Sequence, residues 1–394
     1  MIDFSTLQGL TIPEGVVTQI TDANSRVIWA VKSGGKAVLQ VEKITSDTYA
    51  GETAYTGEQF ILLDIYPKTN GTVKVTYGGL TKTITDTIGA AEPNAQQVFF
   101  GTFNGVSDGV TTPTSGELTI EGDYYAFGSG AYSQSKMISN ISAKCITSVI
   151  DFGCVTLIPV RACMAMLCET IKIPNGVIKI DSGAFESCVN LNKVAIPKSV
   201  SIIVGNPWRL CDCAVNPIVV DNANLAYRID GNCLIEIATN KLVCGFGDAV
   251  VPSYVTTIQD YSFDSITNLK NVVIPSTVKT IAGAAFNGCS NLTSVTIQEG
   301  VEDIGGNAFL GCSALKSLTI PASVKSVGHC PFDKSLMTLT MLATTPPTCT
   351  SSASKKMIFP SSSTATIIVP KGCGEAYKAA EVWSKYADQI VEDS

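Results

Sequence analysis

Hydrophobic and polar positions in the second half of the chain repeat every 23 residues. The segment IPSTVKTIAGAAFNGCSNLTSVT, residues 274–296, is followed at once by IQEGVEDIGGNAFLGCSALKSLT, residues 297–319. Other copies begin at Ile173, Ile196, Val251 and Ile320. A fixed period of this length predicts a solenoid, because one unit cannot bury its apolar face alone and needs a neighbour stacked on it.

Apolar side chains occupy the same places in every copy. The fifth place holds Val177, Val200, Val255, Val278, Val301 and Val324, and the thirteenth holds Phe185, Trp208, Phe263, Phe286, Phe309 and Phe332. Each copy ends in an alternating L-x-x-V-x-I segment, which predicts one short strand per coil with every second side chain inward. Stacked at about 4.8 Å, these strands form a parallel sheet along the solenoid. The segments AAFNGC and NAFLGC predict a short helical turn whose Phe enters the core.

The repeat unit resembles a known family. The motif IP-x-x-V-x-x-I-x-x-x-A-F-x-x-C-x-x-L-x-x-V is similar to the BspA-like leucine-rich repeat family, which occurs on bacterial surface proteins and in some phage proteins. The resemblance covers residues 140–345, and NANLAYRIDGNCLI resembles the family's hairpin-bearing variant repeat, placed at about residues 217–250. Two copies depart from the motif: Ala162 stands where Phe is expected, and the Leu register is lost around Ser335 to Leu339. Terminal repeats commonly deviate because they cap the array.

The remaining segments complete a mainly β fold with short helices. Residues 1–31 predict a β-hairpin that serves as a docking segment, and the linker KSGGK follows it. Residues 36–136 contain β-rich runs broken by Gly, Asn and Pro, which predict a small all-β, sandwich-like domain ahead of the leucine-rich repeat solenoid. Residues 346–394 resemble the family's C-terminal cap, a closing strand followed by an amphipathic helix.

The first residues bear on where the protein acts. No basic stretch or apolar block follows Met1, so we expect no secretory signal peptide. Residues 1–31 also resemble the start of tail-associated proteins from phages of gut bacteria. These features favour a virion component, assembled in the host cytoplasm, whose N-terminus binds phage tail or baseplate proteins and whose repeats bind a glycan or protein on the host surface. The alternative is a BspA-like adhesin on the bacterial cell surface that binds host matrix proteins or other bacteria.

All fourteen cysteines lie at Cys145 or beyond. Cys188, Cys289 and Cys312 share one place in the repeat, beside the aromatic residue, where a small buried side chain is expected. Four others belong to the variant repeat or its flank: Cys211, Cys213, Cys233 and Cys244. Their spacing contains no C-x-x-C pair, which argues against zinc, while a disulfide among them stays open.

Enzymatic and nucleic-acid functions lack their usual signatures. His329 is the only histidine, and no P-loop, G-x-G-x-x-G or G-x-S-x-G motif is present. A glycosidase would need a cleft of paired carboxylates in the β-domain, and no tight acidic cluster is visible. The net charge of -7 without a basic stripe argues against nucleic acid. No apolar run is long enough to span a membrane. We therefore expect no catalytic residue, metal, cofactor or membrane span.

One face of the predicted solenoid is a candidate binding surface. In each predicted strand the twenty-first and twenty-third places point away from the core. They hold Lys193 and Ala195, Asn271 and Val273, Ser294 and Thr296, and Ser317 and Thr319. A solubilising surface is one interpretation of this ribbon. Binding of a protein or glycan is the other, because stacked repeats present an extended surface whose side chains vary while the framework stays fixed.

Overall fold

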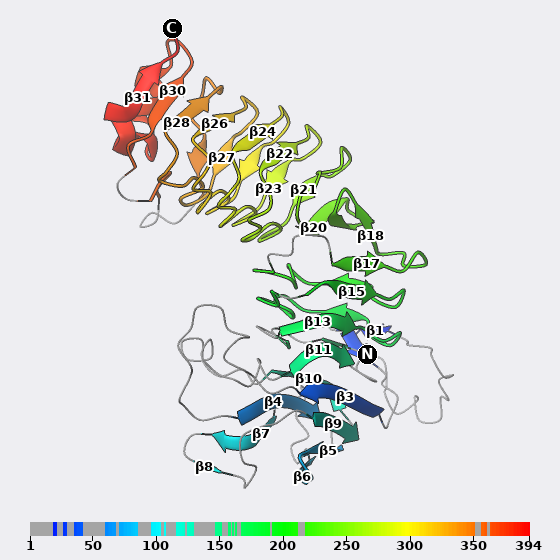
Figure 1. Cartoon of the computed structure of the whole chain (residues 1–394). Coiled ribbons are helices and arrows are strands. Elements are labelled where there is room, and N and C mark those ends of the chain that lie inside the picture. Colours follow the sequence, from blue (N-terminus) through cyan, green and yellow to red (C-terminus); the bar gives the residue numbers. More distant parts are fainter. Residues whose placement is uncertain are drawn as a thin grey trace. The chain divides into compact units, whose positions relative to one another are not determined.

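The chain forms two compact units in a computed structural model (Figure 1). Unit 1 comprises Met1–Ala184 and Lys193–Val204, and unit 2 comprises Phe185–Asn192 and Gly205–Ser394. The structure describes residues 19–21, 27–29, 35–41, 60–67, 71–85, 96–103, 106–107, 116–122, 124–129, 146–151, 157–158, 160, 162–163, 167–189, 191–211, 217–350, 356–360 and 363–394.

The N-terminal part of unit 1 consists of strands. The strand β1 (Gln19–Thr21) pairs antiparallel with β2 (Val27–Trp29). A four-stranded sheet has the order β10 (Tyr124–Ser129), β4 (Phe60–Pro67), β7 (Gln96–Phe103) and β8 (Val106–Ser107). A second sheet contains β6 (Leu80–Thr85), β5 (Thr72–Tyr77), β9 (Gly116–Gly122) and β3 (Gly35–Val41), all antiparallel.

Side chains of these two sheets meet in the interior of unit 1. The rings of Tyr77 on β5 and Phe100 on β7 lie 5.7 Å apart in an edge-to-face arrangement. Val73 and Val75 on β5 are fully buried, as the alternation of that strand requires. This is the packing that a two-layer sandwich makes. The sandwich assignment stays a prediction, because much of the segment between residues 36 and 136 lies outside the described residues.

The second sheet continues directly into the repeats of unit 1. The strand β3 pairs antiparallel with β11 (Ile146–Asp151), which pairs parallel with β13 (Leu167–Lys172), and β13 with β15 (Lys193–Ile196). On another side of the same coils, β12 (Leu157–Ile158), β14 (Lys179–Ile180) and β16 (Ile202–Ile203) form a parallel ladder. The N-terminal strands therefore cover the edge that the first repeat strand would otherwise leave unpaired.

In unit 2 every regular coil carries two strands, so the prediction of one strand per coil was wrong. The long strands are β22 (Asn271–Ile274), β24 (Ser294–Ile297), β26 (Ser317–Ile320), β28 (Thr338–Met341) and β30 (Thr366–Val369). The short strands are β21 (Thr257–Ile258), β23 (Thr280–Ile281), β25 (Asp303–Ile304), β27 (Ser326–Val327) and β29 (Thr348–Cys349). The last two residues of each V-x-x-I segment form the short strand. One of them points outward and the other into the core, and both pair with the equivalent residues of the neighbouring coils.

The long-strand ladder is interrupted once. Parallel pairing joins β22 to β24, and β26 to β28 and β30, whereas the short strands pair without a break from β21 to β29. Figure 1 shows the coils between β21 and β28 stacked one on the next. The predicted parallel sheet is thus present in two pieces on the long-strand side of the described solenoid.

The segment after each short strand forms hydrogen-bonded turns, so the predicted helical turn was also wrong. Within AAFNGC the backbone N–H of Asn287 donates to the carbonyl of Ala284 at 3.1 Å. Ala284 and Gly288 have positive φ values of 53° and 71°. A chain that enters the left-handed region twice within five residues cannot continue as an α-helix.

The predicted core places are confirmed. Val278 and Val301 at the fifth place are fully buried, and so is Phe286 at the thirteenth. The aromatic rings stack along the solenoid, with centroid distances of 4.9 Å from Phe263 to Phe286, 5.2 Å from Phe286 to Phe309, and 6.5 Å from Phe309 to Phe332. Two further aromatic residues, Phe359 and Tyr386, extend the column into the C-terminal segment. Each ring therefore covers the ring of the coil before it.

A variant coil precedes the regular coils of unit 2. It contains β17 (Ile218–Val220) and a three-stranded antiparallel meander, β18 (Tyr227–Asp230), β19 (Cys233–Glu236) and β20 (Lys241–Gly245). The last of these strands pairs parallel with β21 and so starts the short-strand ladder. This coil carries no aromatic turn of the regular kind.

The C-terminal segment extends the ladder beyond residue 345, where the sequence analysis ended the solenoid. β30 pairs parallel with β28 and with the last strand, β31 (Ile390–Glu392). Between them lie a six-residue helix, α1 (Gly374–Ala379), and a 3-10 helix, η5 (Trp383–Gln389). The expected closing strand and the helix after it are present as β30 and α1, and the structure adds η5 and a further strand, β31, which pairs with β30.

Candidate binding site

The outward side chains of the long strands form a continuous exposed face in unit 2. All six residues predicted there are exposed. They are Asn271 and Val273 on β22, Ser294 and Thr296 on β24, and Ser317 and Thr319 on β26. Parallel pairing places Asn271 beside Ser294 and Val273 beside Thr296. Their alternation with buried Val272 and Leu318 follows from the two-residue period of a strand.

The same face continues over β28, which the sequence analysis missed, and over β30, which it expected as the closing strand but did not assign to this face. Thr338 and Thr340 on β28 lie beside Ser317 and Thr319, and Thr366 and Ile368 follow on β30. The signal was present as the alternating segments TLTM and TIIV. It escaped a strict 23-residue frame because Leu318 pairs with Leu339, which is 21 residues further along the chain. We call the outward side chains of β22, β24, β26, β28 and β30 the outer face.

Lys193 and Ala195 are also exposed, on β15. They belong to unit 1, whereas the other predicted residues belong to unit 2. The outer face as defined here is therefore the unit 2 surface alone, and Lys193 remains a separate predicted contact residue of unit 1.

The chemistry of the outer face is polar but uncharged. Its outward places hold hydroxyls and an amide, together with Val273 and Ile368, and no ionisable side chain. Strand neighbours are spaced at about 4.8 Å and alternate outward residues at about 7 Å, so donors and acceptors recur at fixed intervals. Such a surface can form many weak hydrogen bonds to an extended partner, and it holds no nucleophile paired with a base.

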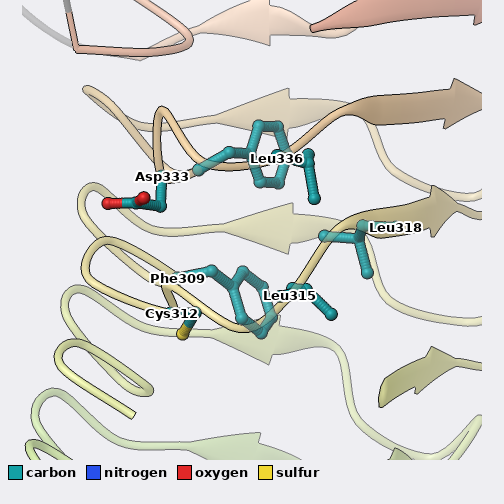
Figure 2. A pocket seen from close by; sticks show the side chains of 7 residues that line it. Phe309, Cys312, Leu315, Leu318, Asp333 and Leu336 are labelled. Atoms are coloured by element: carbon teal, nitrogen blue, oxygen red, sulfur yellow. The ribbon is translucent and has the colours of Figure 1, made fainter. Parts of the chain in front are cut away.

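A small gap in the core lies between the coil that contains Phe309 and the coil that contains Phe332 (Figure 2). Phe309, Leu315 and Leu318 of one coil face Phe332 and Leu336 of the next around a gap too small to hold a water molecule. Phe332 lies 23 residues after Phe309, but Leu336 lies only 21 after Leu315, so two residues are missing between them. The gap between the side chains drawn in Figure 2 therefore offers no room for a ligand.

The cysteines of the repeats act as buried donors. The Sγ atoms of Cys211, Cys289 and Cys312 donate to the carbonyls of Phe185, Phe263 and Phe286, the aromatic residues of the preceding regular coils, at 3.0, 3.0 and 3.1 Å. Burial raises the pKa of the Cys312 thiol to about 12. These contacts give the repeated cysteine a polar role in addition to the packing role that the sequence predicted.

The variant-coil cysteines do not form a metal site within the described residues. The thiols of Cys211, Cys233 and Cys244 are fully buried, and burial raises the pKa of the Cys244 thiol well above its ordinary value. Cys213, the fourth member of the set considered for zinc, lies outside the described residues. In the described part of the chain no group of three or more His, Cys, Asp or Glu side chains is placed to bind a metal ion.

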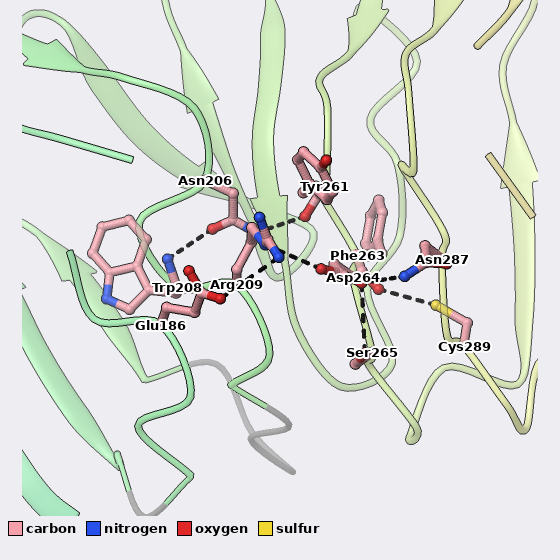
Figure 3. A network of polar contacts seen from close by, with 10 residues as sticks. All are labelled: Glu186, Asn206, Trp208, Arg209, Tyr261, Phe263, Asp264, Ser265, Asn287 and Cys289. Atoms are coloured by element: carbon pink, nitrogen blue, oxygen red, sulfur yellow. Dashed lines mark hydrogen bonds and ion pairs between the residues drawn. The ribbon is translucent and has the colours of Figure 1, made fainter. Parts of the chain in front are cut away.

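A buried network of polar groups lies at the aromatic turns of unit 2 (Figure 3). The Arg209 guanidinium lies 3.2 Å from Asp264 and 3.6 Å from Glu186, and it covers the ring of Tyr261 at 4.2 Å from the ring centroid. Asn287 donates to the other oxygen of Asp264 at 2.8 Å. Sequence reasoning missed this network, although Glu186, Arg209, Asp264 and Asn287 all follow the aromatic residue of their own copy.

The network contains more negative than positive charge. Two carboxylates, Glu186 and Asp264, are buried with one guanidinium. Burial raises the pKa of Asp264 above its ordinary value, while Asn287 and Arg209 act in the opposite direction. The indole N–H of Trp208 is buried nearby without a hydrogen-bond partner among the described residues. The two carboxylates are buried while Arg209 and Tyr261 are partly exposed, and the contacts of Arg209 join one turn to another, so the network is better suited to holding coils together than to binding a ligand.

Comparison with known proteins identifies the family. The sequence profile of the BspA type leucine rich repeat region matches six copies, at residues 156–224 and 243–373, which is just over half of the chain. The chain belongs to the BspA type leucine-rich repeat family. The BspA type match continues past residue 345 and leaves out residues 225–242, which form most of the variant-coil meander.

Solved structures with a similar fold include two bacterial proteins. The pneumococcal vaccine antigen PcpA is 19% identical, with a TM-score of 0.46 over 59% of this chain and 70% of that one. A leucine rich cell surface protein from Faecalibacterium prausnitzii A2-165 is 23% identical, with a TM-score of 0.45 over 53% of this chain and 61% of that one. No curated protein sequence matches the chain. The resemblance of residues 1–31 to phage tail-associated proteins finds no support in these comparisons.

Among the described residues, no helix has the length and apolar character needed to cross a bilayer.

Proposed function

We propose that this BspA type protein is a non-catalytic adhesin whose outer face binds a protein or glycan on a cell surface or in the host matrix. The observation that carries the proposal is the outer face itself, whose uncharged side chains are exposed on β22, β24 and β26 and exposed or half-buried on β28 and β30, with parallel pairing from β22 to β24 and from β26 to β30. Membership of the BspA type family supports it, because the family's repeats are expected on bacterial surface proteins.

A broad, flat and uncharged face suits an extended partner. Hydrogen bonds to hydroxyl groups contribute little singly, so affinity must come from many contacts made at once. Solenoids supply such repeated contacts without a new core for each increment. The proposed contact residues are Asn271, Val273, Ser294, Thr296, Ser317 and Thr319, to which the structure adds Thr338, Thr340 and Thr366.

The test places charge on the outer face and, as a control, on the short-strand side. The full chain with Ser317→Lys and Thr319→Lys on β26 is compared with Thr257→Lys and Thr348→Lys on β21 and β29. Both pairs add the same charge at outward strand positions. We expect the β26 pair to reduce binding to immobilised matrix proteins or bacterial cells at least tenfold and the control pair to change it less than twofold. Equal effects of the two pairs would rule out the outer face.

The choice of target separates the adhesin from the virion hypothesis. Wild-type chain is applied to immobilised host matrix proteins and to whole gut bacterial cells in the same assay. Binding to matrix proteins, or to many bacterial species, is expected of an adhesin. Binding restricted to particular bacterial strains, with none to matrix proteins, would instead support the phage interpretation of residues 1–31.

A further inference from the structure

Regular coils are joined on their turn side by a backbone ladder. The N–H groups of Tyr261, Phe263 and Ser265 donate to carbonyls of the next coil, those of Gly283, Ala285 and Asn287, at 3.1, 2.7 and 2.7 Å. The same three bonds join the next two coils, and in the pair after that the third N–H, of Gly311, donates to the Asp333 side chain instead of a carbonyl. Together with the stacked aromatic rings, this ladder joins every regular turn to the one after it.

The variant coil breaks both connections. Its strand β20 reaches the core with Gly245 where a regular coil has an aromatic residue, and a Cβ atom at Gly245 would lie 2.1 Å from the Phe263 ring. The aromatic column therefore falls into two parts, Phe185 with Trp208 at 5.7 Å, and the stack that begins at Phe263. The turn after Asn206 meets the turn after Tyr261 directly, although 55 residues separate them in the chain.

Side chains replace the missing ladder at this joint. The N–H of Trp208 donates at 2.9 Å to the side-chain oxygen of its own neighbour, Asn206, instead of to a following coil. The amide nitrogen of Asn206 in turn donates to the carbonyl of Tyr261 at 2.7 Å. One asparagine thus satisfies a donor on one side of the joint and an acceptor on the other, as Figure 3 shows.

Arg209 adds the charged part of the connection. It bridges Glu186, one turn back, to Asp264 beyond the joint, and its guanidinium lies over the Tyr261 ring. Glu186 and Asp264 are 7% and 2% exposed, so this is not a solvated surface pair. Without the guanidinium, these two buried carboxylates would lose the cation that they share. We call Glu186, Asn206, Arg209, Tyr261 and Asp264 the joint clamp.

We infer that the joint clamp is a latch that makes unit 2 one cooperative body, and that the turns between Phe185 and Cys211 open separately from the regular coils when the latch is released. At the variant coil the turn-side connection depends mainly on side chains, so we expect the array to divide there. This conformational role is independent of the proposed adhesive function.

Hydrogen exchange measured by mass spectrometry on the full chain tests the latch. In Arg209→Gln the amides of Phe185, Ser187 and Trp208 are expected to exchange at least tenfold faster, whereas those between Thr280 and Val327 change less than twofold. The exposed pair formed by Lys325 and Glu302 supplies the control, Lys325→Gln, which should change neither region. Unchanged exchange near Phe185 in Arg209→Gln would overturn the inference, and so would a uniform increase across unit 2.

A rescue variant distinguishes the charge latch from simple loss of packing. Adding Glu186→Gln and Asp264→Asn to Arg209→Gln also removes the two negative charges that Arg209 contacts. We expect at least half of the lost protection from hydrogen exchange to return. No recovery would mean that Arg209 acts only by filling space. If Arg209→Gln does not fold, Arg209→Lys keeps the charge without the planar fork and should raise exchange near Phe185 about threefold to tenfold. An Arg209→Lys profile identical to wild type would then overturn the inference.

Discussion

The regular coils and the variant-coil joint solve the same packing problem with different groups. From Phe263 onward each coil repeats an aromatic ring, a short strand in one unbroken ladder, and backbone hydrogen bonds between turns, and Cys289 and Cys312 add buried donors in two of the coils. At the joint, Gly245 replaces the ring and the joint clamp replaces one ladder. The regular solution depends on apolar burial and backbone bonds, which any neighbour provides. The joint depends on particular side chains, which makes it sensitive to single substitutions and to pH.

The largest expected effect comes from removing a ring of the regular column. Phe286 is fully buried between Phe263 and Phe309, so Phe286→Ala should lower the free energy of unfolding by about 3–5 kcal/mol. Urea denaturation followed by tryptophan fluorescence measures this. Leu310→Ala, at a half-buried place of the next coil, is the control and should cost far less. A loss below about 1 kcal/mol for Phe286→Ala would show that the ladders, not the rings, stabilise the regular coils.

A smaller effect is expected at the joint when a methyl group is added. In Gly245→Ala the new Cβ would lie 2.1 Å from Cε1 of Phe263, so the ring or the strand must move. Overpacking of this kind typically costs about 1–3 kcal/mol. Combining it with Phe263→Leu makes room, and the double variant should be more stable than the sum of the single losses predicts. Strict additivity would mean that Gly245 is required for another reason.

The smallest effect concerns charge and depends on pH. Because burial raises the pKa of Asp264, the folded chain holds this proton more tightly than the unfolded chain. Its contribution to stability is present below the ordinary pKa and is lost as the pH rises through the raised pKa. Asp264→Asn removes that loss and leaves Arg209 paired with Glu186. The variant should therefore gain stability relative to wild type as the pH rises above the ordinary pKa of an aspartate, measured by urea titrations at a series of pH values.

Glu302 gives the opposite case on the surface. Lys325 lowers the pKa of Glu302, so any stability from this carboxylate is present above its ordinary pKa and is lost as the pH falls. The pair is exposed, and solvent screens it. Glu302→Gln should leave the denaturation midpoint unchanged over the same series of pH values. An equal response of Glu302→Gln and Asp264→Asn would contradict the distinction between the regular coils and the joint.

Much of the fold was predictable because equivalent residues of successive repeats can be aligned by counting along the sequence. The buried valines, the aromatic column and the exposed residues Ser294 and Ser317 follow from counting in steps of 23. Counting failed where the step changes. The pair Leu318 and Leu339 is two residues short of it, and Phe332 and Phe359 are four residues beyond it. Hence Thr338 and Thr366 of the outer face were missed.

The sequence by itself determined the solenoid, its period, its buried places and the outward places of three unit 2 strands. It could do so because every copy carries the same pattern of apolar and polar residues at the same spacing. Only the tertiary structure decided what meets across the variant coil. Arg209 and Asp264 are 55 residues apart with an irregular segment between them, and no local rule places their turns side by side. That contact depends on how the variant meander occupies the core without a turn of its own, which is set by packing over the whole coil.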